Sequence, residues 1–474
     1  GTRVRERPTC LEPPSRYRGT VRPIRQAAAR TPASRRRDLD LLRAAAICAV
    51  VVGHWLLMTV GRTHDGHLTG FTALPQLAWA HGLTWLFQVM PVFFLVGGAV
   101  SAISWTHQRD RGETATAWLL DRSARLFPPL TVFLLVVAAG AGVARLAHAP
   151  PDVVEQAVAL VILPLWFLVV YLGVTALTPL TYRLHERYGL AVPVVLVAGV
   201  AAGDLLRFTT GHELAGAGSF VFGWLAVHHA GYAWHDGTLA LGPRRAALIV
   251  VAGMAALVLL TVPGPYPVSM VTVPGAAMQN PAPPTLALLA LATTQLGVVA
   301  LLSRPARQWL ARPGPWTAVV AVNTVVLTVY LWHLVAALLG ALALDTLGWL
   351  PPSDPSTTAW WSGRVPWLAA LAVVLAVLVM LLAPIENRAS ARRRPGVPTD
   401  GHRTRRAAAA ARLARTGPVV GAYAATVGGL LWLTVAGTGR HGPLVLPTGA
   451  LVMVLAGATV LHLARAAGCR STAQ

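Results

Sequence analysis

The sequence predicts an all-α, polytopic membrane protein, with a ten-helix core and two extra C-terminal transmembrane helices. Of its 474 residues, 55% are hydrophobic and only 12% are charged, and the mean hydropathy is +0.58. Soluble domains of ordinary composition carry charge on about a quarter of their residues. A bilayer core requires roughly 20 consecutive apolar residues per helix, and runs of this length recur along the whole chain.

Twelve apolar runs account for the predicted membrane spans. They cover residues 41–60, 81–104, 126–146, 156–180, 190–206, 217–234, 246–263, 285–302, 318–343, 365–384, 418–437 and 444–466. The fifth and sixth runs are the least regular, because Asp204, Arg207 and a pair of histidines interrupt them.

The arginines predict the orientation of the chain. There is no lysine, so all 39 basic residues are arginine, and the formal net charge is +21. With a cytoplasmic N-terminus, 34 arginines fall in tails and loops on the cytoplasmic side and only five on the other, as the positive-inside rule requires. Because these arginines flank apolar runs and do not cover a soluble domain, no nucleic-acid partner is expected. The sequence therefore predicts a multi-pass protein of the cell membrane with both termini in the cytoplasm.

The predicted spans divide the chain into five parts. Residues 1–37 are Arg- and Pro-rich without the apolar core of a signal peptide, and are expected to form a disordered cytoplasmic tail. Residues 38–388 form the main membrane domain, and 389–417 an Arg- and Ala-rich cytoplasmic linker. Residues 418–466 form a two-helix appendage, and 467–474 a short tail.

No metal site is expected from the cysteines. Cys10, Cys48 and Cys469 are too few and too scattered for a disulfide framework or a metal centre. Cys48 lies inside the first apolar run, where it is expected to pack as a small hydrophobic residue.

The first span, LDLLRAAAICAVVVGHW at 39–55, carries an ionisable ring deep in the membrane. Arg43 and His54 are eleven residues apart, so their side chains point about 20° apart around the helix and lie roughly 16 Å apart along it. Asp40 is on the same face. Ionisable groups at membrane depth are rare and usually face a cavity or pathway, so His54 is a candidate general base. The alternative, a positive-inside anchor and a structural histidine, remains open at this point.

Two further stretches add polar residues to the apolar runs. In WLLDRSARLFPPL at 118–130, Arg122 and Arg125 lie on one helical face and suit phosphate binding, although ordinary positive-inside arginines fit equally well. The following prolines predict that the third span begins at 128–129, where a helix N-terminus would also favour anions. In VYLWHLV at 329–335, His333 lies about as deep in its span as His54 does in the first, so the two imidazoles are expected to share a depth.

Taken together, these segments resemble the acyltransferase-3 family of integral membrane O-acyltransferases. The shared segments, in order, are LDLLR…GHW, PVFFLVGGAVSA (91–102), DRSARLFPP, LPLWFLVVYL (163–172), VYLWH and PIENR (384–388). They cover about three-quarters of the chain. The composition, rich in Ala, Gly and Pro with Arg in place of Lys, is typical of a high-GC genome, so an actinobacterial member is expected.

The resemblance implies a reaction with acyl-CoA, by default acetyl-CoA, supplied from the cytoplasm as co-substrate, with no bound cofactor. Arg122 and Arg125 would hold the phosphates of the donor, and Arg43 would seat it at the mouth of a cavity. His54 would deprotonate the acceptor hydroxyl.

The remaining implied residues support the base and line the site. Asp40 or Glu386 would orient the donor or the base, and Trp166 and His333 would line the cavity. The acceptor would be a glycan, a glycolipid or a secondary metabolite, and membrane lipid would surround the protein. A transporter or exporter of a lipid or small molecule is the alternative, weakened by the absence of an internal sequence repeat and by few intramembrane carboxylates.

Overall fold

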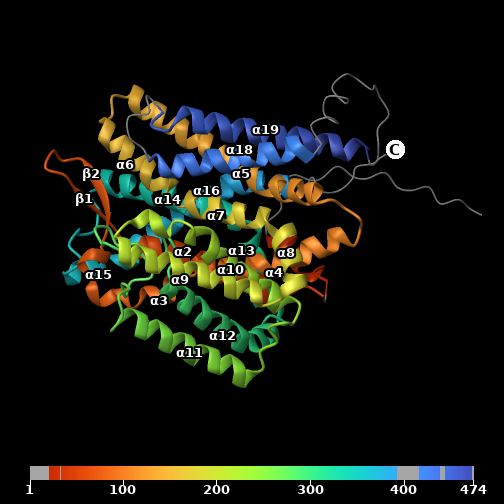
Figure 1. Ribbon diagram of the computed structural model, residues 1–474. Coiled ribbons are helices and arrows are strands. Elements are labelled where there is room, and N and C mark those ends of the chain that lie inside the picture. The colour runs from red at the N-terminus through yellow and green to blue at the C-terminus, as the bar shows by residue number, and fades with distance from the viewer. Residues whose placement is uncertain (1–20, 33, 392–415, 438–443, 472–474) are drawn as a thin grey trace, which may run out of the picture.

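The computed structural model describes residues 21–32, 34–391, 416–437 and 444–471. In this part of the chain, long helices lie side by side between two ends, with short helices and one hairpin at the ends (Figure 1). Eleven of the described helices are long and apolar enough to cross a membrane. The predicted all-α class of polytopic membrane protein is therefore confirmed. Most of the predicted tail and linker lies outside the described residues.

The elements of the first half follow one another as helices with one two-stranded interruption. The helices are α1 (Val21–Ala29), α2 (Arg37–Leu57), α3 (Thr84–Phe87), α4 (Met90–Arg109), α5 (Ala115–Leu146), α6 (Pro151–Ile162), α7 (Leu165–Ala176), α8 (Thr178–Tyr188), α9 (Ala191–Thr210) and α10 (Ser219–His235). The strands β1 (Met58–Arg62) and β2 (Leu68–Thr72) pair antiparallel, and short 3₁₀ turns cover Leu74–Gln76, Ala78–His81 and Glu213–Gly216.

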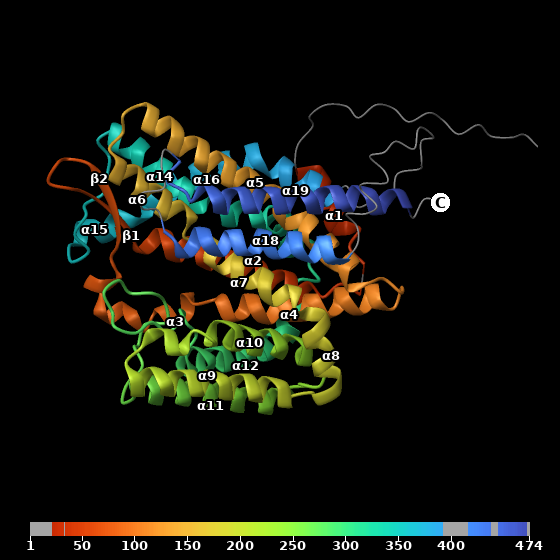
Figure 2. The same ribbon diagram turned by 45° about the horizontal axis from the view of Figure 1, so that its top comes forward.

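The second half is entirely helical apart from its loops. Its helices are α11 (Pro243–Thr261), α12 (Leu286–Trp309), α13 (Pro313–Thr324), α14 (Val326–Thr346), α15 (Thr358–Ser362), α16 (Arg364–Ala391), α18 (Thr416–Val435) and α19 (Thr448–Ser471). In the view of Figure 2, α9 and α11 form one flank, and α18 and α19 lie on the opposite side of α4.

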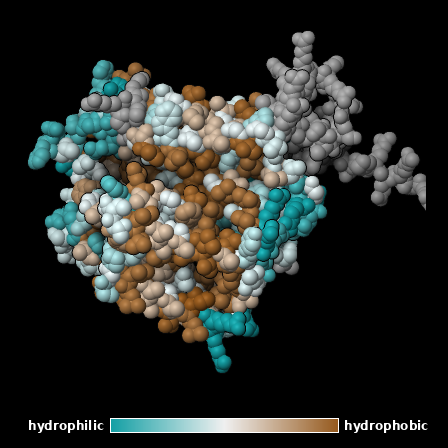
Figure 3. Space-filling view, in the orientation of Figure 1, coloured by the Kyte–Doolittle hydropathy of each residue, from teal (hydrophilic) through white to brown (hydrophobic). Residues whose placement is uncertain are grey.

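Alternate loops gather at opposite ends of the bundle. The hairpin and α15 lie at one end, while α8 and the last turns of α19 lie at the other (Figure 1). Contacts join the loops at each end: the indole of Trp85 donates to the carbonyl oxygen of Val268 at 2.7 Å, and Arg109 pairs with Glu186 at 2.8 Å. Apolar residues cover the middle of the visible face and hydrophilic residues its two ends (Figure 3). The placement of alternate loops at opposite ends agrees with the predicted order of the spans.

The sixth predicted span differs from the other eleven. Residues 217–234 form α10, which has 17 residues and is mostly buried, with Trp224 and Tyr232 fully enclosed. Because neighbouring helices enclose this short helix, its adjacent histidines are buried inside the protein. With this helix, all twelve predicted spans are helical in the structure.

Three predicted spans are each divided into two helices, the first of them 81–104, which contains α3 and most of α4. The span at 156–180 breaks between α6 and α7 at Leu163–Pro164, and the span at 318–343 breaks between α13 and α14 at Val325. None of these breaks is visible in hydropathy, which measures apolar content and not backbone hydrogen bonding. At the break before α14, the carboxylate of Glu386 accepts from the amides of Leu327 and Thr328 at 3.2 and 2.9 Å, and so caps α14.

The prediction that Pro128 and Pro129 begin a helix is wrong. Both prolines lie inside α5, which starts at Ala115. Each proline removes one backbone hydrogen bond, but membrane helices tolerate this loss where neighbouring helices enclose the backbone. No helix N-terminus therefore follows Arg122 and Arg125, and they project from an unbroken helix.

Close packing of α4 against α10 depends on two glycines. A Cβ on Gly98 would lie 1.9 Å from the carbonyl oxygen of His228, and one on Gly231 would lie 2.2 Å from that of Leu95. Small residues allow membrane helices to approach at backbone distance. These two positions therefore set the separation of the two helices.

We expect Gly98→Ala to lower the free energy of unfolding by about 1–3 kcal/mol, because the added methyl group forces α4 and α10 apart. Thermal or denaturant unfolding in detergent measures the change. Gly140→Ala, on α5, is the matched control, since a Cβ there meets nothing within 4 Å. Equal stability of the two variants would contradict the role of Gly98.

Candidate active site

His54 and His333 meet edge to edge between α2 and α14. His54 Nδ1 lies 2.9 Å from His333 Nε2, and the two rings are nearly parallel, at 12°, with centroids 5.1 Å apart. The expectation that the two imidazoles share a depth is confirmed. Their contact joins residues that are 279 positions apart in the sequence.

The hydrogen-bond network assigns the tautomer of each ring. His333 Nδ1 lies 2.6 Å from the carbonyl oxygen of Tyr330, which only accepts, so this nitrogen carries the hydrogen. Neutral His333 then has a lone pair on Nε2, which accepts from the Nδ1–H of His54. The lone pair of His54 is consequently on Nε2. A histidine held in this way is prepared to accept a proton.

His54 also remains accessible. Protein atoms surround it densely, yet its side chain is exposed, whereas that of His333 is fully buried. His54 thus combines close protein neighbours with accessible surface. The outer ring nitrogen of His54 is therefore available to a substrate, and His333 supports it from behind.

Two tryptophans fix the helices that carry this pair. The indole of Trp55 donates to the carbonyl oxygen of His333 at 2.9 Å, and the indole of Trp367 on α16 donates to that of Trp55, also at 2.9 Å. All of these groups are buried. The contacts tie α2 to α14 and α16 at the depth of the imidazoles, which limits movement of the rings.

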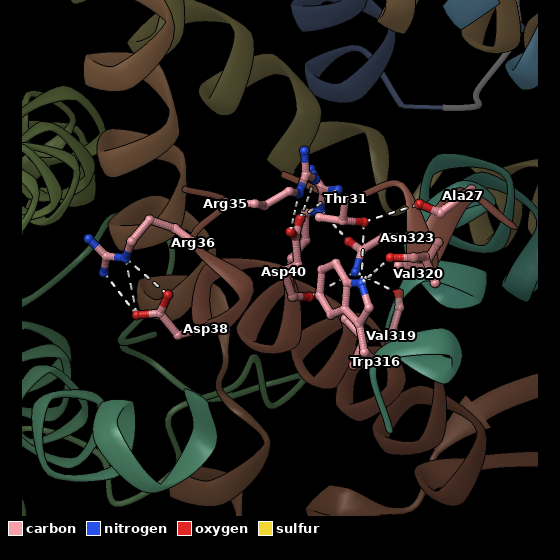
Figure 4. Close-up of polar contacts among 12 residues, drawn as sticks. Ala27, Thr31, Arg35, Arg36, Asp38, Asp40, Trp316, Val319, Val320 and Asn323 are labelled. Atoms are coloured by element: carbon pink, nitrogen blue, oxygen red, sulfur yellow. Dashed lines mark hydrogen bonds and ion pairs between the residues drawn. The ribbon is translucent and has the colours of Figure 1, made fainter. Parts of the chain in front are cut away.

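Arg43 and Asp40 lie at the end of the bundle near α8, on the same helix as His54. Arg43 Nε donates to Asn323 Oδ1 at 2.6 Å, and Arg35 makes a bidentate pair with Asp40 at 2.7 and 2.9 Å (Figure 4). Arg43 also lies 3.8 Å from Asp40. Fourteen residues separate Asp40 from His54, about 21 Å along a helix axis, so this carboxylate does not contact the imidazole.

Glu386 is likewise occupied elsewhere. Besides the two amides that it caps, it accepts from the hydroxyl of Thr328 at 2.6 Å. It therefore positions the start of the helix that carries His333 and does not touch either ring. The structure brings His333, predicted only to line the cavity, to His54. It places Asp40 and Glu386, predicted to orient the donor or the base, in other contacts.

The other predicted arginines lie on α5. Arg122 donates to the hydroxyls of Ser101 and Ser104 on α4 at 3.1 and 3.0 Å, and its guanidinium lies 5.1 Å from the ring centre of Trp118. Arg122 is half-buried and Arg125 is exposed. The serines and the tryptophan hold one guanidinium in place, which reduces the entropy lost when it binds an anion.

A row of aromatic rings extends from this region towards the histidines. Phe167 lies 5.6 Å from both Tyr171 and Tyr330, and Tyr330 lies 6.2 Å from His333. A Cβ on Gly97 would come within 2.9 Å of Tyr171, so glycine there admits the ring. The predicted lining residue Trp166, next to Phe167 in sequence, is half-buried and packs 6.5 Å from Trp224.

A second histidine cluster lies at the α8 end of the bundle. His185 Nδ1 is 2.8 Å from His229 Nε2, and His185 Nε2 is 2.6 Å from the carboxylate of Asp236. Burial alone would raise the pKa of Asp236, but hydrogen bonds from Thr238 and His185 outweigh it and lower that pKa. The sequence signal was the adjacent pair His228–His229 in an apolar run, which hydropathy treats only as an irregularity. No group of His, Cys, Asp and Glu suited to a metal ion occurs in the described part of the chain.

Comparison with known families places the site within a recognised domain. A family model described as an acyltransferase domain matches residues 36–383. The match begins just before α2 and ends inside α16, so it includes His54, His333 and Arg122, and it leaves out α1, α18 and α19. No curated protein and no solved structure matches the chain.

Proposed function

The chain belongs to the acyltransferase-3 family of membrane acyltransferases, and from this premise we propose that it transfers an acyl group from cytoplasmic acyl-CoA to a hydroxyl group. Acetyl-CoA is the default donor, and the acceptor is a glycan, a glycolipid or a secondary metabolite. The observation that supports this reaction best is the accessible His54, whose lone pair the contact with His333 directs outward. The proposal places the protein in the cell membrane with both termini in the cytoplasm.

His54 acts as the general base in this proposal. Its Nε2 takes the proton of the acceptor hydroxyl as the oxygen attacks the thioester carbonyl. The new C–O bond forms, the C–S bond breaks, and the CoA sulfur leaves with a proton returned from the imidazolium. Throughout, the Nδ1–H of His54 stays bonded to His333, so the ring keeps its orientation while it gains and loses charge.

The arginines hold the donor. Arg43 lies at the α8 end of the bundle, on the same face of α2 as His54 and roughly 16 Å from it along the axis. Arg122 and Arg125 supply guanidinium groups suited to phosphate oxygens. A CoA thioester carries its charge at one end and its reactive carbon at the other, which accounts for the separation of arginine and histidine.

The function is tested by transfer of radiolabelled acetyl from acetyl-CoA into lipid, glycan or metabolite fractions by membranes that contain the protein. We expect Arg122→Ala to raise the KM for acetyl-CoA about tenfold or more, because hydrogen bonds to charged groups contribute about 1.5–3 kcal/mol. Arg111→Ala is the control, since that guanidinium is exposed and donates to the carbonyl oxygen of His107.

Two results would count against the proposal. An unchanged KM in Arg122→Ala would remove this arginine from the donor site. Membranes in which the folded protein uses neither acetyl-CoA nor longer acyl-CoAs would favour the exporter of a lipid or small molecule.

A further inference from the structure

A basic cavity of about 330 Å³ lies at the α8 end of the bundle, between α1, α2 and α13. Its walls include Arg30, Arg35 and Arg43, with Asp40 as the one acidic residue. Three guanidiniums and one carboxylate leave the cavity with a positive charge of two. A volume near 300 Å³ is at the lower end of the range for small-molecule pockets and suits a compact group.

The wall contributed by α1 is a packed part of the fold. The indole of Trp316 on α13 donates to the carbonyl oxygen of Ala28 at 3.2 Å and lies 3.3 Å from the hydroxyl of Thr31 (Figure 4). Ala28 is buried, and the guanidinium of Arg37 lies 4.8 Å from the ring centre of the same tryptophan. This helix precedes the residues 36–383 that match the family model.

Some of the N–H groups around the cavity already have hydrogen-bond partners, and others do not. Arg35 uses two nitrogens on Asp40, and Arg43 uses Nε on Asn323. Arg30 is exposed, and within the described residues its side chain makes no hydrogen bond or ion pair. One outer nitrogen of Arg43 also lies 3.8 Å from Asp40. Arg30 and the other outer nitrogen of Arg43 thus remain as charged donors lining one small volume, which is the requirement for binding a phosphate group.

We propose that this cavity binds a phosphate monoester or diester, and that α1 is part of the binding site. Two ligands carry that chemistry at this end of the molecule: the 3′-phosphate of the CoA donor and the headgroup of an anionic lipid. The first rests on the proposed function. Trp316 is only 3% exposed and so is not available to stack on an adenine ring, which makes the phosphate the group that is recognised.

The geometry connects the cavity with the catalytic histidine. Arg43 lines the cavity and shares a face of α2 with His54, about three helical turns away. A CoA molecule whose phosphate is held here can direct its thioester along that face. An anionic lipid held here would instead anchor α1 at the membrane surface.

The test compares Arg30→Ala, at the residue just after α1, with Arg25→Ala, an exposed arginine of α1 that does not line the cavity. The purified protein is assayed for binding of acetyl-CoA and of 3′-dephospho-acetyl-CoA. For the CoA source, we expect Arg30→Ala to weaken acetyl-CoA binding about tenfold, to leave binding of the dephospho compound unchanged, and Arg25→Ala to match the wild type.

A second arm uses nanodiscs of phosphatidylcholine with or without phosphatidylglycerol. For the lipid source, Arg30→Ala but not Arg25→Ala loses the retention of phosphatidylglycerol, and the two CoA compounds bind alike. The inference is overturned if Arg30→Ala neither weakens acetyl-CoA binding selectively nor reduces the retention of phosphatidylglycerol. Because both arms measure binding, a protein that transfers no acyl group but shows either difference would overturn the proposed function alone.

Discussion

Replacing His54 with alanine is expected to lower acyl transfer by about 10²–10⁴-fold, the usual contribution of a general base. The acceptor hydroxyl would lose the group that removes its proton. The donor site would be preserved, because Arg43 and Arg122 are held by Asn323, Ser101 and Ser104. Transfer of radiolabelled acetyl at saturating acetyl-CoA, normalised to folded protein, measures the effect.

Two variants separate proton transfer from packing at this position. His54→Gln keeps an amide that can donate to His333 but has no base of comparable strength, so it should be as inactive as alanine. His64→Ala, an exposed histidine in the hairpin turn, should transfer acetyl at the wild-type rate. Transfer by His54→Ala within threefold of wild type would remove the histidine from the chemistry.

The membrane architecture could be predicted because it depends on local composition. Runs of apolar residues between arginines determine where helices cross, and the structure has helices at all twelve positions. The spacing of Arg43 and His54 placed both on one face because helical geometry is regular. Equal depth in two separate spans was sufficient to anticipate that His54 and His333 lie at one level.

Features that depend on distant partners could not be predicted from local patterns. The break at Val325 is stabilised by Glu386, about 60 residues further along, and no local rule links the two. The family resemblance predicts instead that this carboxylate orients the donor or the base. Pro128 and Pro129 continue a helix because its neighbours enclose it, although local chemistry favours a helix start there. The contact of His185 with His229 needed the fold of α8 against α10.

Replacing His333 with leucine is expected to lower kcat about 10²-fold while changing the KM for acetyl-CoA little. His333 touches neither donor nor acceptor in the proposed reaction, so it is a positioning residue that acts through His54. Without its Nε2, the Nδ1–H of His54 has no acceptor, and the ring is free to rotate or to change tautomer. Misplacement of a reacting group by about 1 Å is enough to cost this factor.

Rescue by glutamine distinguishes positioning from bulk packing. His333→Gln offers an oxygen to accept from His54 and an amide to donate to the carbonyl of Tyr330, so it should recover part of the lost kcat, whereas leucine should not. His229→Leu removes a buried histidine from the other histidine pair and is the matched control. It should leave kcat per folded molecule near wild type. If leucine and glutamine at position 333 are equally slow, or if His229→Leu is as slow as either, the contribution of His333 is packing, and the lone pair of His54 is directed by another group.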